Sequence, residues 1–441
     1  MATRKLTFYQ GIILNPLDDK RCDFYPEGML VVKGKGSKAR IVDLLPKTKA
    51  LKKYSEISAS NTVICKNSVI LPGFFDMHFH WVQDDVRQMP KDSLLEWLEK
   101  YTFPTEMKFA SKLYAKKKAK EFFKKLVSVG TLGGACYSSV HEHAVEEAMG
   151  QAKGDFVIGN VLMNMNSPAK LTQGKDEALS MTKRLIKKFG SRHSFTPRFA
   201  ITTAPEVMRE GSRLADKAKC FKQTHLSETN NEIDFVLSLY RKMPGFEDVA
   251  SYTEIYQRTG MLGKRSLMGH GIHLSDKELN ILRKTKTAVI HCPTSNAPIK
   301  EQGLGSGLFD FKKIEKNKIR WALGSDIGGG PFLSMFDVMR SFVEQNKGMN
   351  SKEATYVKSL YRATLAGAEI LRLDKKTGNL TKGKEANFVV VPLKNKKEVK
   401  TAEEVLELLI NPHRSKRVNY ETMVSMVCYQ GEALFQRKTS N

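Results

Sequence analysis

The feature that most constrains the fold is a regular alternation of apolar, strand-like runs with amphipathic, helix-like runs. Eight strands are predicted, at residues 69–79, 131–137, 156–163, 198–202, 223–226, 266–270, 287–291 and 320–325. Helical patterns between or after them include residues 176–189, 205–219, 231–240, 276–283 and 334–345. Eight such units are the number that an α/β protein needs to close a parallel (β/α)8 barrel of the TIM type.

Both ends of the chain have a different pattern. Short strands separated by Gly, Pro and charged residues fill the first part, for example at 28–32 and 62–65, and short strands return at 388–391 and 423–429. We therefore predict that residues 1–70 and 372–441 form one small β-sandwich-like domain and that residues 71–371 form the barrel.

The charge of the chain is strongly positive, with 72 Lys and Arg against 47 Asp and Glu and a formal net charge of +25. A large excess of basic over acidic residues can indicate nucleic-acid binding. Here, however, the lysines are spread along the chain. In and directly after the densest stretch, 108–125, the residues Phe109, Leu113, Phe122, Phe123 and Leu126 recur at helical spacing. This pattern is typical of an amphipathic helix with a solvated face, so we expect no nucleic-acid partner.

Cysteine spacing and hydropathy bear on the compartment. The six cysteines show no CxxC spacing, which favours reduced thiols in a cytoplasmic protein over a disulfide framework. No run approaches the ~18 apolar residues that cross a bilayer, and the first residues lack the apolar stretch of a secretory signal. We expect no membrane partner.

Two histidines stand at the end of the first predicted barrel strand, in the segment Asp76-Met77-His78-Phe79-His80. Residues i and i+2 of a strand point to the same side, so His78 and His80 can bind one metal ion together. The carboxyl ends of the strands are where such barrels place their chemistry.

Three more candidate ligands follow at later strand ends. His225 ends the fifth predicted strand, His270 ends the sixth, and Asp326 follows the eighth. With only ten histidines in the chain, this placement is hard to obtain by chance. Imidazoles with one carboxylate suit Zn²⁺, and Fe²⁺ is an alternative.

The remaining histidines are expected to have lesser roles. His291 ends the seventh predicted strand and is interpreted as a structural residue or an outer partner of the ligands. His141 and His143 follow the second strand and are expected in a loop near the barrel mouth, and His193 and His413 at the surface.

These motifs together resemble the amidohydrolase superfamily and, within it, the guanine deaminase family. The resemblance rests on the HxH pair followed by Gln83, on Pro-Arg-Phe at 197–199, Thr-His-Leu-Ser-Glu at 224–228, Met-Gly-His-Gly at 268–271, His-Cys-Pro-Thr-Ser-Asn at 291–296 and Gly-Ser-Asp-Ile-Gly-Gly at 324–329. It covers most of the chain from about residue 71 to residue 330. Gln83 and the Arg198-Phe199 pair are its most specific parts.

The resemblance implies hydrolytic deamination of guanine to xanthine and ammonia by a metal-activated water, in purine catabolism or salvage. It implies one Zn²⁺ per chain and a homodimer. The implied metal ligands are His78, His80, His225 and Asp326. The implied catalytic residues are Glu228, which protonates the ring nitrogen next to C2, Asp326, which takes the proton of the water, and His270, which hydrogen-bonds the attacking oxygen.

The resemblance also implies which residues contact the small-molecule purine. Gln83 and Arg198 bind polar ring edges, and Phe199 and Trp81 pack against the ring face. A sister aminohydrolase that acts on another purine, a pyrimidine or a triazine ring remains an alternative. The more distant alternative is a non-enzymatic protein that binds nucleic acid through its basic surface.

Overall fold

The computed structural model describes residues 5–91, 93–348, 351–393, 398–411 and 418–437. Contacts divide the chain into two compact units, one formed by Met1–Asp76, Lys124–Gly134 and Leu333–Asn441 and the other by Met77–Phe123 and Ala135–Phe332. The division into a β domain and a barrel at residues 70 and 372 stays a prediction.

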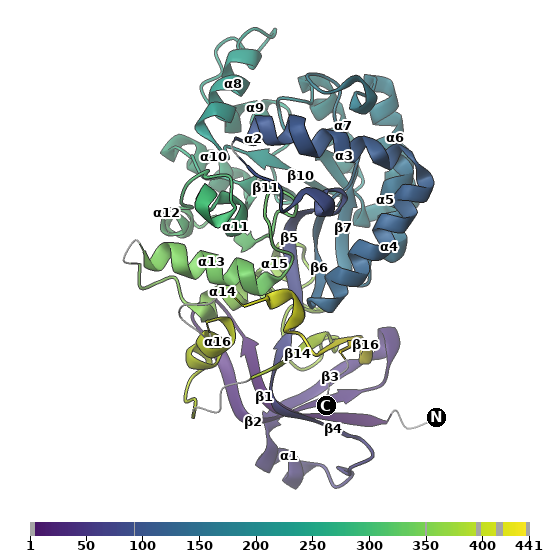
Figure 1. Cartoon of the computed structure of the whole chain (residues 1–441), viewed down its shortest axis with the longest axis vertical. Coiled ribbons are helices and arrows are strands. Elements are labelled where there is room, and N and C mark those ends of the chain that lie inside the picture. Colours follow the sequence, from purple (N-terminus) through teal and green to yellow (C-terminus); the bar gives the residue numbers. More distant parts are fainter. Residues whose placement is uncertain (1–4, 92, 349–350, 394–397, 412–417, 438–441) are drawn as a thin grey trace. The chain divides into compact units, whose positions relative to one another are not determined.

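The chain forms the predicted (β/α)8 barrel (Figure 1). Its strands are β5 (Phe74–His80), β6 (Thr131–Tyr137), β7 (Asp155–Gly159) with β8 (Val161–Leu162), β9 (Ser194–Pro197), β10 (Phe221–Leu226), β11 (Ser266–His270), β12 (Ala288–His291) and β13 (Trp321–Leu323). Strands β8 to β13 pair in parallel in chain order, and β5, β6 and β7 form a second hydrogen-bonded group.

Two sets of backbone contacts close the barrel. A parallel bridge between Ile158 and His193 joins the two groups of strands. On the other side, the Asp326 amide donates to the His78 carbonyl at 2.7 Å and the His80 amide donates to the Ile327 carbonyl at 2.6 Å. The second contact set lies at the strand ends that carry the predicted ligands. Closure of the sheet therefore also brings His78, His80 and Asp326 together.

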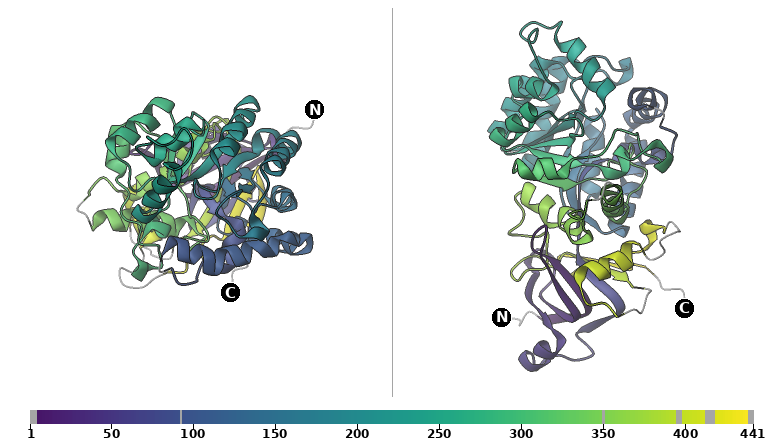
Figure 2. Two further views of the ribbon diagram at one scale, coloured as in Figure 1. Left: turned by 90° about the horizontal axis from the view of Figure 1, so that it is seen from above. Right: turned by 90° about the vertical axis from the view of Figure 1, so that its left-hand side faces the viewer.

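Helices run around the outside of the strands (Figure 2). Those of the second unit are α2 (Leu94–Trp97), α3 (Phe103–Met107), α4 (Lys112–Ser128, which extends into the first unit), α5 (Glu142–Gln151), α6 (Lys175–Phe189), α7 (Pro205–Lys217), α8 (Asn230–Tyr240), α9 (Tyr252–Arg258), α10 (Asp276–Thr285), α11 (Pro293–Asn296) and α12 (Phe311–Lys316). Capping boxes begin α8 at Thr229 and α10 at Ser275. In the described part of the chain, no helix has the length and hydropathy of a membrane span.

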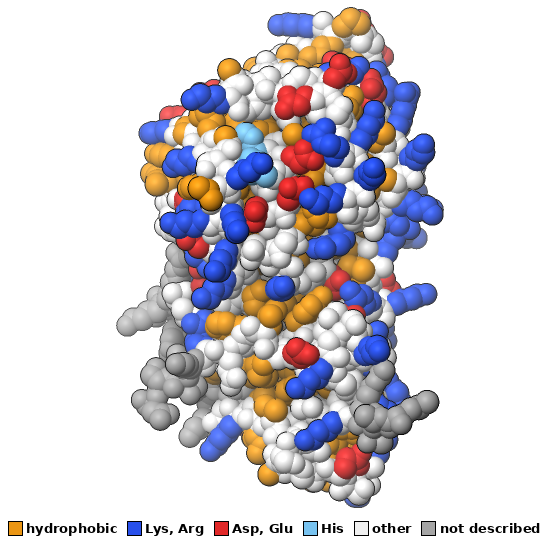
Figure 3. Space-filling view, turned by 90° about the vertical axis from the view of Figure 1, so that its right-hand side faces the viewer, with side chains coloured by type: hydrophobic (Ala, Val, Ile, Leu, Met, Phe, Trp, Pro, Cys, Tyr) orange, Lys and Arg blue, Asp and Glu red, His pale blue; other side chains and the backbone are white. Residues whose placement is uncertain are grey.

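The basic segment 108–125 overlaps the expected amphipathic helix, α4 (Lys112–Ser128). Phe122, Phe123 and Leu126 are buried, whereas Leu113 is 82% exposed and lies outside the buried face of the helix. On the face drawn in Figure 3, Lys and Arg are scattered with Asp and Glu among them and form no single basic patch.

Several predicted strands have the wrong bounds. Residues 156–163, for example, form β7 and β8, which belong to different sheets. Residues 69–79 form two strands, β4 (Thr62–Pro72) and β5, which belong to different sheets. Residues 198–202 are not a strand, because β9 ends at Pro197 and the apolar segment after it turns toward α7. Arg198 therefore stands at the carboxyl end of its strand, like the candidate ligands.

The first unit contains one seven-stranded sheet, in the order β16-β15-β14-β4-β1-β2-β3. Its strands are β1 (Leu6–Pro16), β2 (Cys22–Lys33), β3 (Arg40–Pro46), β4, β14 (Phe388–Pro392), β15 (Met426–Tyr429) and β16 (Glu432–Gln436), and its helices are α1 (Lys47–Lys53), α13 (Met335–Lys347), α14 (Tyr356–Arg362), α15 (Leu365–Ile370) and α16 (Ala402–Ile410). Both ends of the chain contribute strands to this one sheet. Separate apolar clusters, around Tyr9 with Phe388 and around Phe8 with Met29, form its core.

Candidate metal centre and pocket

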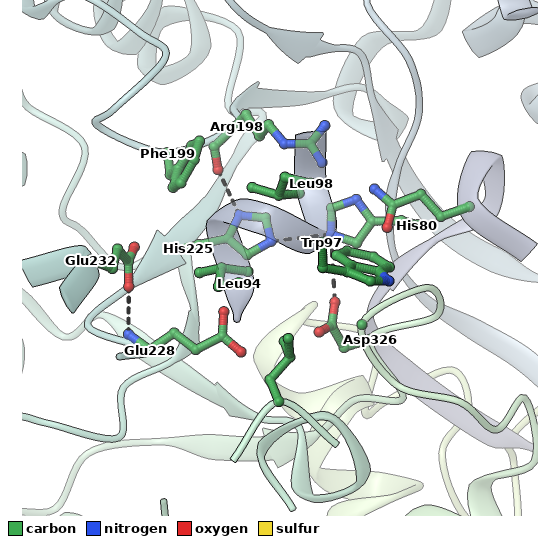
Figure 4. A pocket seen from close by; sticks show the side chains of 13 residues that line it. His80, Leu94, Trp97, Leu98, Arg198, Phe199, His225, Glu228, Glu232 and Asp326 are labelled. Atoms are coloured by element: carbon green, nitrogen blue, oxygen red, sulfur yellow. Dashed lines mark hydrogen bonds and ion pairs between the residues drawn. The ribbon is translucent and has the colours of Figure 1, made fainter. Parts of the chain in front are cut away.

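Five side chains at the carboxyl ends of the barrel strands converge. One ligand atom each from His78, His225, His270 and Asp326 lies within 4.8 Å of all the others. His80 reaches the same place, because its Nε2 lies 3.1 Å from Nε2 of His225 and 3.6 Å from Oδ1 of Asp326 (Figure 4). The structure thus brings together all four predicted ligands, with His270 beside them.

The protonation of these histidines suits a divalent cation. Burial lowers the pKa of His78 to about 3 and of His270 to about 4, and it lowers the pKa values of His80 and His225 well below the ordinary range. Neutral imidazoles have the lone pair that a metal ligand needs.

The backbone fixes the orientation of one candidate ligand. Nδ1 of His225 lies 2.6 Å from the carbonyl oxygen of Arg198, which can only accept, so Nδ1 carries the proton. The lone pair of His225 Nε2 then faces the cluster, where Nε2 of His80 lies only 3.1 Å away. Two imidazole nitrogens that face each other beside a carboxylate fit a shared cation, so the residues present fit the metal that the sequence predicts.

The backbone is strained where two of these side chains leave their strands. His270 has φ 69° and Asp326 has φ 50°, both in the left-handed region that residues with a side chain rarely adopt. Such conformations cost free energy and persist where the surrounding structure enforces them. Here they direct both side chains toward the cluster.

Glu228 lies beside the cluster in a buried polar group. Its Oε1 accepts from Nδ2 of Asn296 at 3.1 Å and from Oγ of Ser306 at 3.3 Å, and it lies 3.3 Å from Nδ1 of His270. Burial, followed by the negative charge of Asp326, raises the pKa of Glu228 well above its ordinary value. A carboxyl group in this environment favours the protonated form, which can donate a proton.

A pocket opens onto the cluster. Its lining includes His80, His225, Glu228 and Asp326, the predicted substrate residues Gln83, Arg198 and Phe199, and also Leu94, Trp97, Leu98, Glu232, Leu304 and Gly329 (Figure 4). Three of the four predicted substrate residues therefore line the same pocket as the candidate ligands His80, His225 and Asp326.

Trp81 does not line this pocket, which contradicts its predicted contact with the ring. Its indole is 1% exposed, packs against Phe109 and Phe123, and donates to Oγ of Ser138 at 2.9 Å. Trp81 begins the 3-10 helix Trp81–Val86 directly after β5, and these contacts hold its indole outside the pocket lining. Trp97 lines the pocket together with Phe199.

Other histidines lie outside the cluster. The ring of His291 stacks on Phe309, with centroids 4.3 Å apart, consistent with a structural role. Nε2 of His143 contacts the carbonyl of Phe109 at 2.8 Å, and the rings of His141 and His143 stack. His193 was predicted at the surface and is fully buried, whereas His413 lies outside the described residues.

Several residues in the pocket or directly behind it were not predicted. Glu106, in α3, is fully buried and accepts from both Arg198 and Gln83. Asn296 and Ser306 hold Glu228, and Trp97 comes from α2. One feature of the sequence could have indicated Glu106. It is the charged residue in the largely apolar segment Phe-Pro-Thr-Glu-Met, residues 103–107, which precedes the helical pattern of the basic segment.

Comparisons with known proteins agree with the fold and with the motifs. Residues 69–416 match the model of the amidohydrolase family. A guanine deaminase of Escherichia coli (strain K12) is 34% identical over 334 residues, which are 74% of this chain and 73% of that protein. One of Dictyostelium discoideum is 30% identical over 414 residues, or 88% and 89% of the two chains.

A solved structure also aligns over nearly the whole chain. The structure of guanine deaminase from C. acetobutylicum, which has guanine bound in its active site, superposes with a TM-score of 0.84 at 27% identity and covers 98% of this chain and 100% of that one. The chain therefore belongs to the amidohydrolase family, and within it to the guanine deaminases.

Proposed function

We propose that this chain is a guanine deaminase, which hydrolyses guanine to xanthine and ammonia with the consumption of one water. The observation that carries the proposal is the convergence, in one pocket, of a metal-binding cluster, a buried carboxyl group and a polar wall that fits a purine. Guanine deaminases are also the relatives to which the chain is similar over most of its length.

His78, His80, His225 and Asp326 would hold the metal. Three neutral imidazoles and one carboxylate favour Zn²⁺, with Fe²⁺ as the alternative. When bound, such a cation lowers the pKa of a water molecule to about 7 and so makes it a nucleophile near neutral pH.

The protein supplies the proton transfers. Asp326 takes a proton from the attacking water, and Glu228 gives one to the ring nitrogen next to C2. Glu228 then takes up the remaining proton of the added hydroxyl group as the C2 carbonyl forms and passes it to the leaving amine. The proton held by Asp326 finally restores the protonated Glu228. His270 is oriented for a third role. Its Nδ1 lies 3.1 Å from Nδ2 of Asn296, so its Nε2, 3.9 Å from Asp326 Oδ2, carries the proton and can donate to the attacking oxygen.

The pocket walls bind and orient the base. Arg198 and Gln83 contact its polar edge, and the ring of Phe199 packs against its face. Trp97, Leu94 and Leu98 form an apolar wall that excludes water from the reaction.

Ammonia release from a panel of bases tests the proposal. The purified protein is incubated with guanine, adenine, cytosine and an aminotriazine, and we expect rapid ammonia release from guanine with xanthine as the other product. Faster release from another base would reassign the enzyme to a sister aminohydrolase. A protein that turns over none of them but binds RNA in a salt-dependent manner would contradict the proposal.

The expected homodimer and cytoplasmic location belong to the same proposal. Analytical ultracentrifugation should give twice the mass of the 441-residue chain. A monomer at micromolar concentration would contradict the dimer and leave the proposed reaction unaffected.

A further inference from the structure

Glu106 is a buried acidic residue that the reaction proposed above does not use. It lies in α3, its side chain is fully buried, and it stands behind the polar wall of the pocket. Both of its oxygens accept from Nη1 of Arg198, each at 2.9 Å. A buried carboxylate is costly unless it is paired, so its presence here needs an explanation.

Glu106 also contacts the second polar residue of the wall. Nε2 of Gln83 donates to Oε1 of Glu106 at 2.7 Å. An ionised carboxylate can only accept, so it determines which end of the amide faces it: the NH₂ group must point to Glu106 and the oxygen must point away. Without this contact, both orientations of the amide would be open.

The loop after β13 holds the same amide from the other side. A Cβ atom added to Gly328 would lie 2.7 Å from Oε1 of Gln83 and 2.5 Å from its Cβ, so the amide fits only because residue 328 has no side chain. Arg198 is held in a similar way, with its guanidinium 5.3 Å from the ring centre of Phe103. Both polar side chains are therefore fixed in the free protein.

We propose that Glu106 is a positioning residue that sets the substrate preference of the pocket: it orients Arg198 to donate and Gln83 to accept, so that the pocket selects a 6-oxopurine. The inference rests on the proposed function. A 6-oxopurine has a carbonyl oxygen next to a ring N–H, which complements guanidinium donors and an amide oxygen. A 6-aminopurine presents the opposite pattern and would leave buried polar groups unpaired.

The test compares two substrates that carry the same 2-amino leaving group. Guanine has the 6-oxo group and 2-aminopurine lacks it, so the ratio of their kcat/KM values measures how strongly the pocket recognises that group. In Glu106→Gln the side chain keeps its size, but its amide can face Gln83 in either orientation and Arg198 loses its countercharge. We expect the ratio to fall about 10- to 100-fold, mainly through a higher KM for guanine.

Two further variants separate positioning from folding. Glu106→Asp keeps the charge and should retain part of the ratio. Glu278→Gln is the matched control, because Glu278 is also buried but belongs to the capping box of α10 and accepts from Thr253 and Ser275 instead of from pocket residues. It should leave the ratio and the KM for guanine unchanged.

The outcomes distinguish this inference from the proposed function. If the wild-type protein does not deaminate guanine, the proposed function fails first. If the wild type is active and Glu106→Gln keeps its ratio with bound metal unchanged, Glu106 does not set the preference. If Glu106→Gln does not fold, the same ratio is measured in Gln83→Leu, which leaves the Arg198–Glu106 pair intact. A ratio equal to that of the wild type would overturn the inference.

Discussion

At the scale of single residues, burial determines most of the protonation states of the site. It keeps the cluster imidazoles neutral, and it favours the protonated form of Glu228. Asn296 and the Arg198 carbonyl then fix which nitrogen of His270 and of His225 faces the cluster. The strand ends supply the residue types, and their neighbours determine the proton positions.

We predict that Glu228→Gln retains the metal and loses activity. An amide of the same size keeps the hydrogen bonds of the site but cannot give up a proton, so kcat for guanine should fall about 10²- to 10⁴-fold. Metal content by elemental analysis should stay at the wild-type value. Wild-type turnover in this variant would remove Glu228 from the mechanism, and Glu278→Gln serves as the control for a buried change elsewhere.

Part of the site could be predicted from the sequence, for a physical reason. His78, His80, His225, His270 and Asp326 all stand at strand ends, and parallel strands bring their carboxyl ends to one side of a barrel. The remaining contacts depend on segments without a regular pattern. Glu106 and Trp97 come from short helical turns, and Asn296 and Ser306 from the segment after β12, so no spacing rule places them.

At the scale of secondary-structure elements, the barrel depends on close approach between its strands. Strand β6 lies so near β5 that a Cβ atom on Gly134, which has φ +146°, would be 1.7 Å from the carbonyl oxygen of Asp76. Element boundaries are less visible in the sequence than the elements themselves. The run Phe199-Ala200-Ile201 is buried like a strand but lies in the turn after β9, and burial alone does not separate the two cases.

We predict opposite effects for two Gly→Ala changes. Gly134→Ala forces two strands apart and strains the backbone, so it should lower the free energy of unfolding by more than about 2 kcal/mol. Gly150→Ala in α5 meets no atom within 4 Å and should raise it by about 0.5–1 kcal/mol, because Ala is the better helix former. Urea unfolding measures both, and equal effects would contradict the tight contact at Gly134.

At the scale of the whole molecule, buried titratable groups link stability to pH. His193 is fully buried beside β9, and burial lowers its pKa to about 4. In the unfolded chain the same group titrates near 6.5. The folded state therefore binds fewer protons, and the stabilisation is complete above about pH 6.5 and is lost as the pH falls toward 4.

We predict that His193→Gln weakens this pH dependence. When the pH falls from 7 to 5, the protonation of His193 in the unfolded chain should lower the unfolding free energy of the wild type by about 2 kcal/mol. The unfolding free energy of the variant should not show this part of the decrease. Urea titrations at the two pH values give the change in unfolding free energy for each protein. Subtracting the change in the variant from that in the wild type leaves the contribution of His193, because the other histidines are common to both proteins. Parallel pH profiles would show that His193 is not held neutral by burial.

The most direct measurement follows guanine turnover against metal occupancy in one protein preparation. Chelator-treated protein is reloaded stepwise with Zn²⁺, and bound zinc and ammonia release are measured at each step. Turnover should rise in proportion to bound zinc up to one ion per chain, and His225→Ala should neither retain the ion nor regain activity. Undiminished ammonia release from metal-free protein would contradict a metal centre at His78, His80, His225 and Asp326.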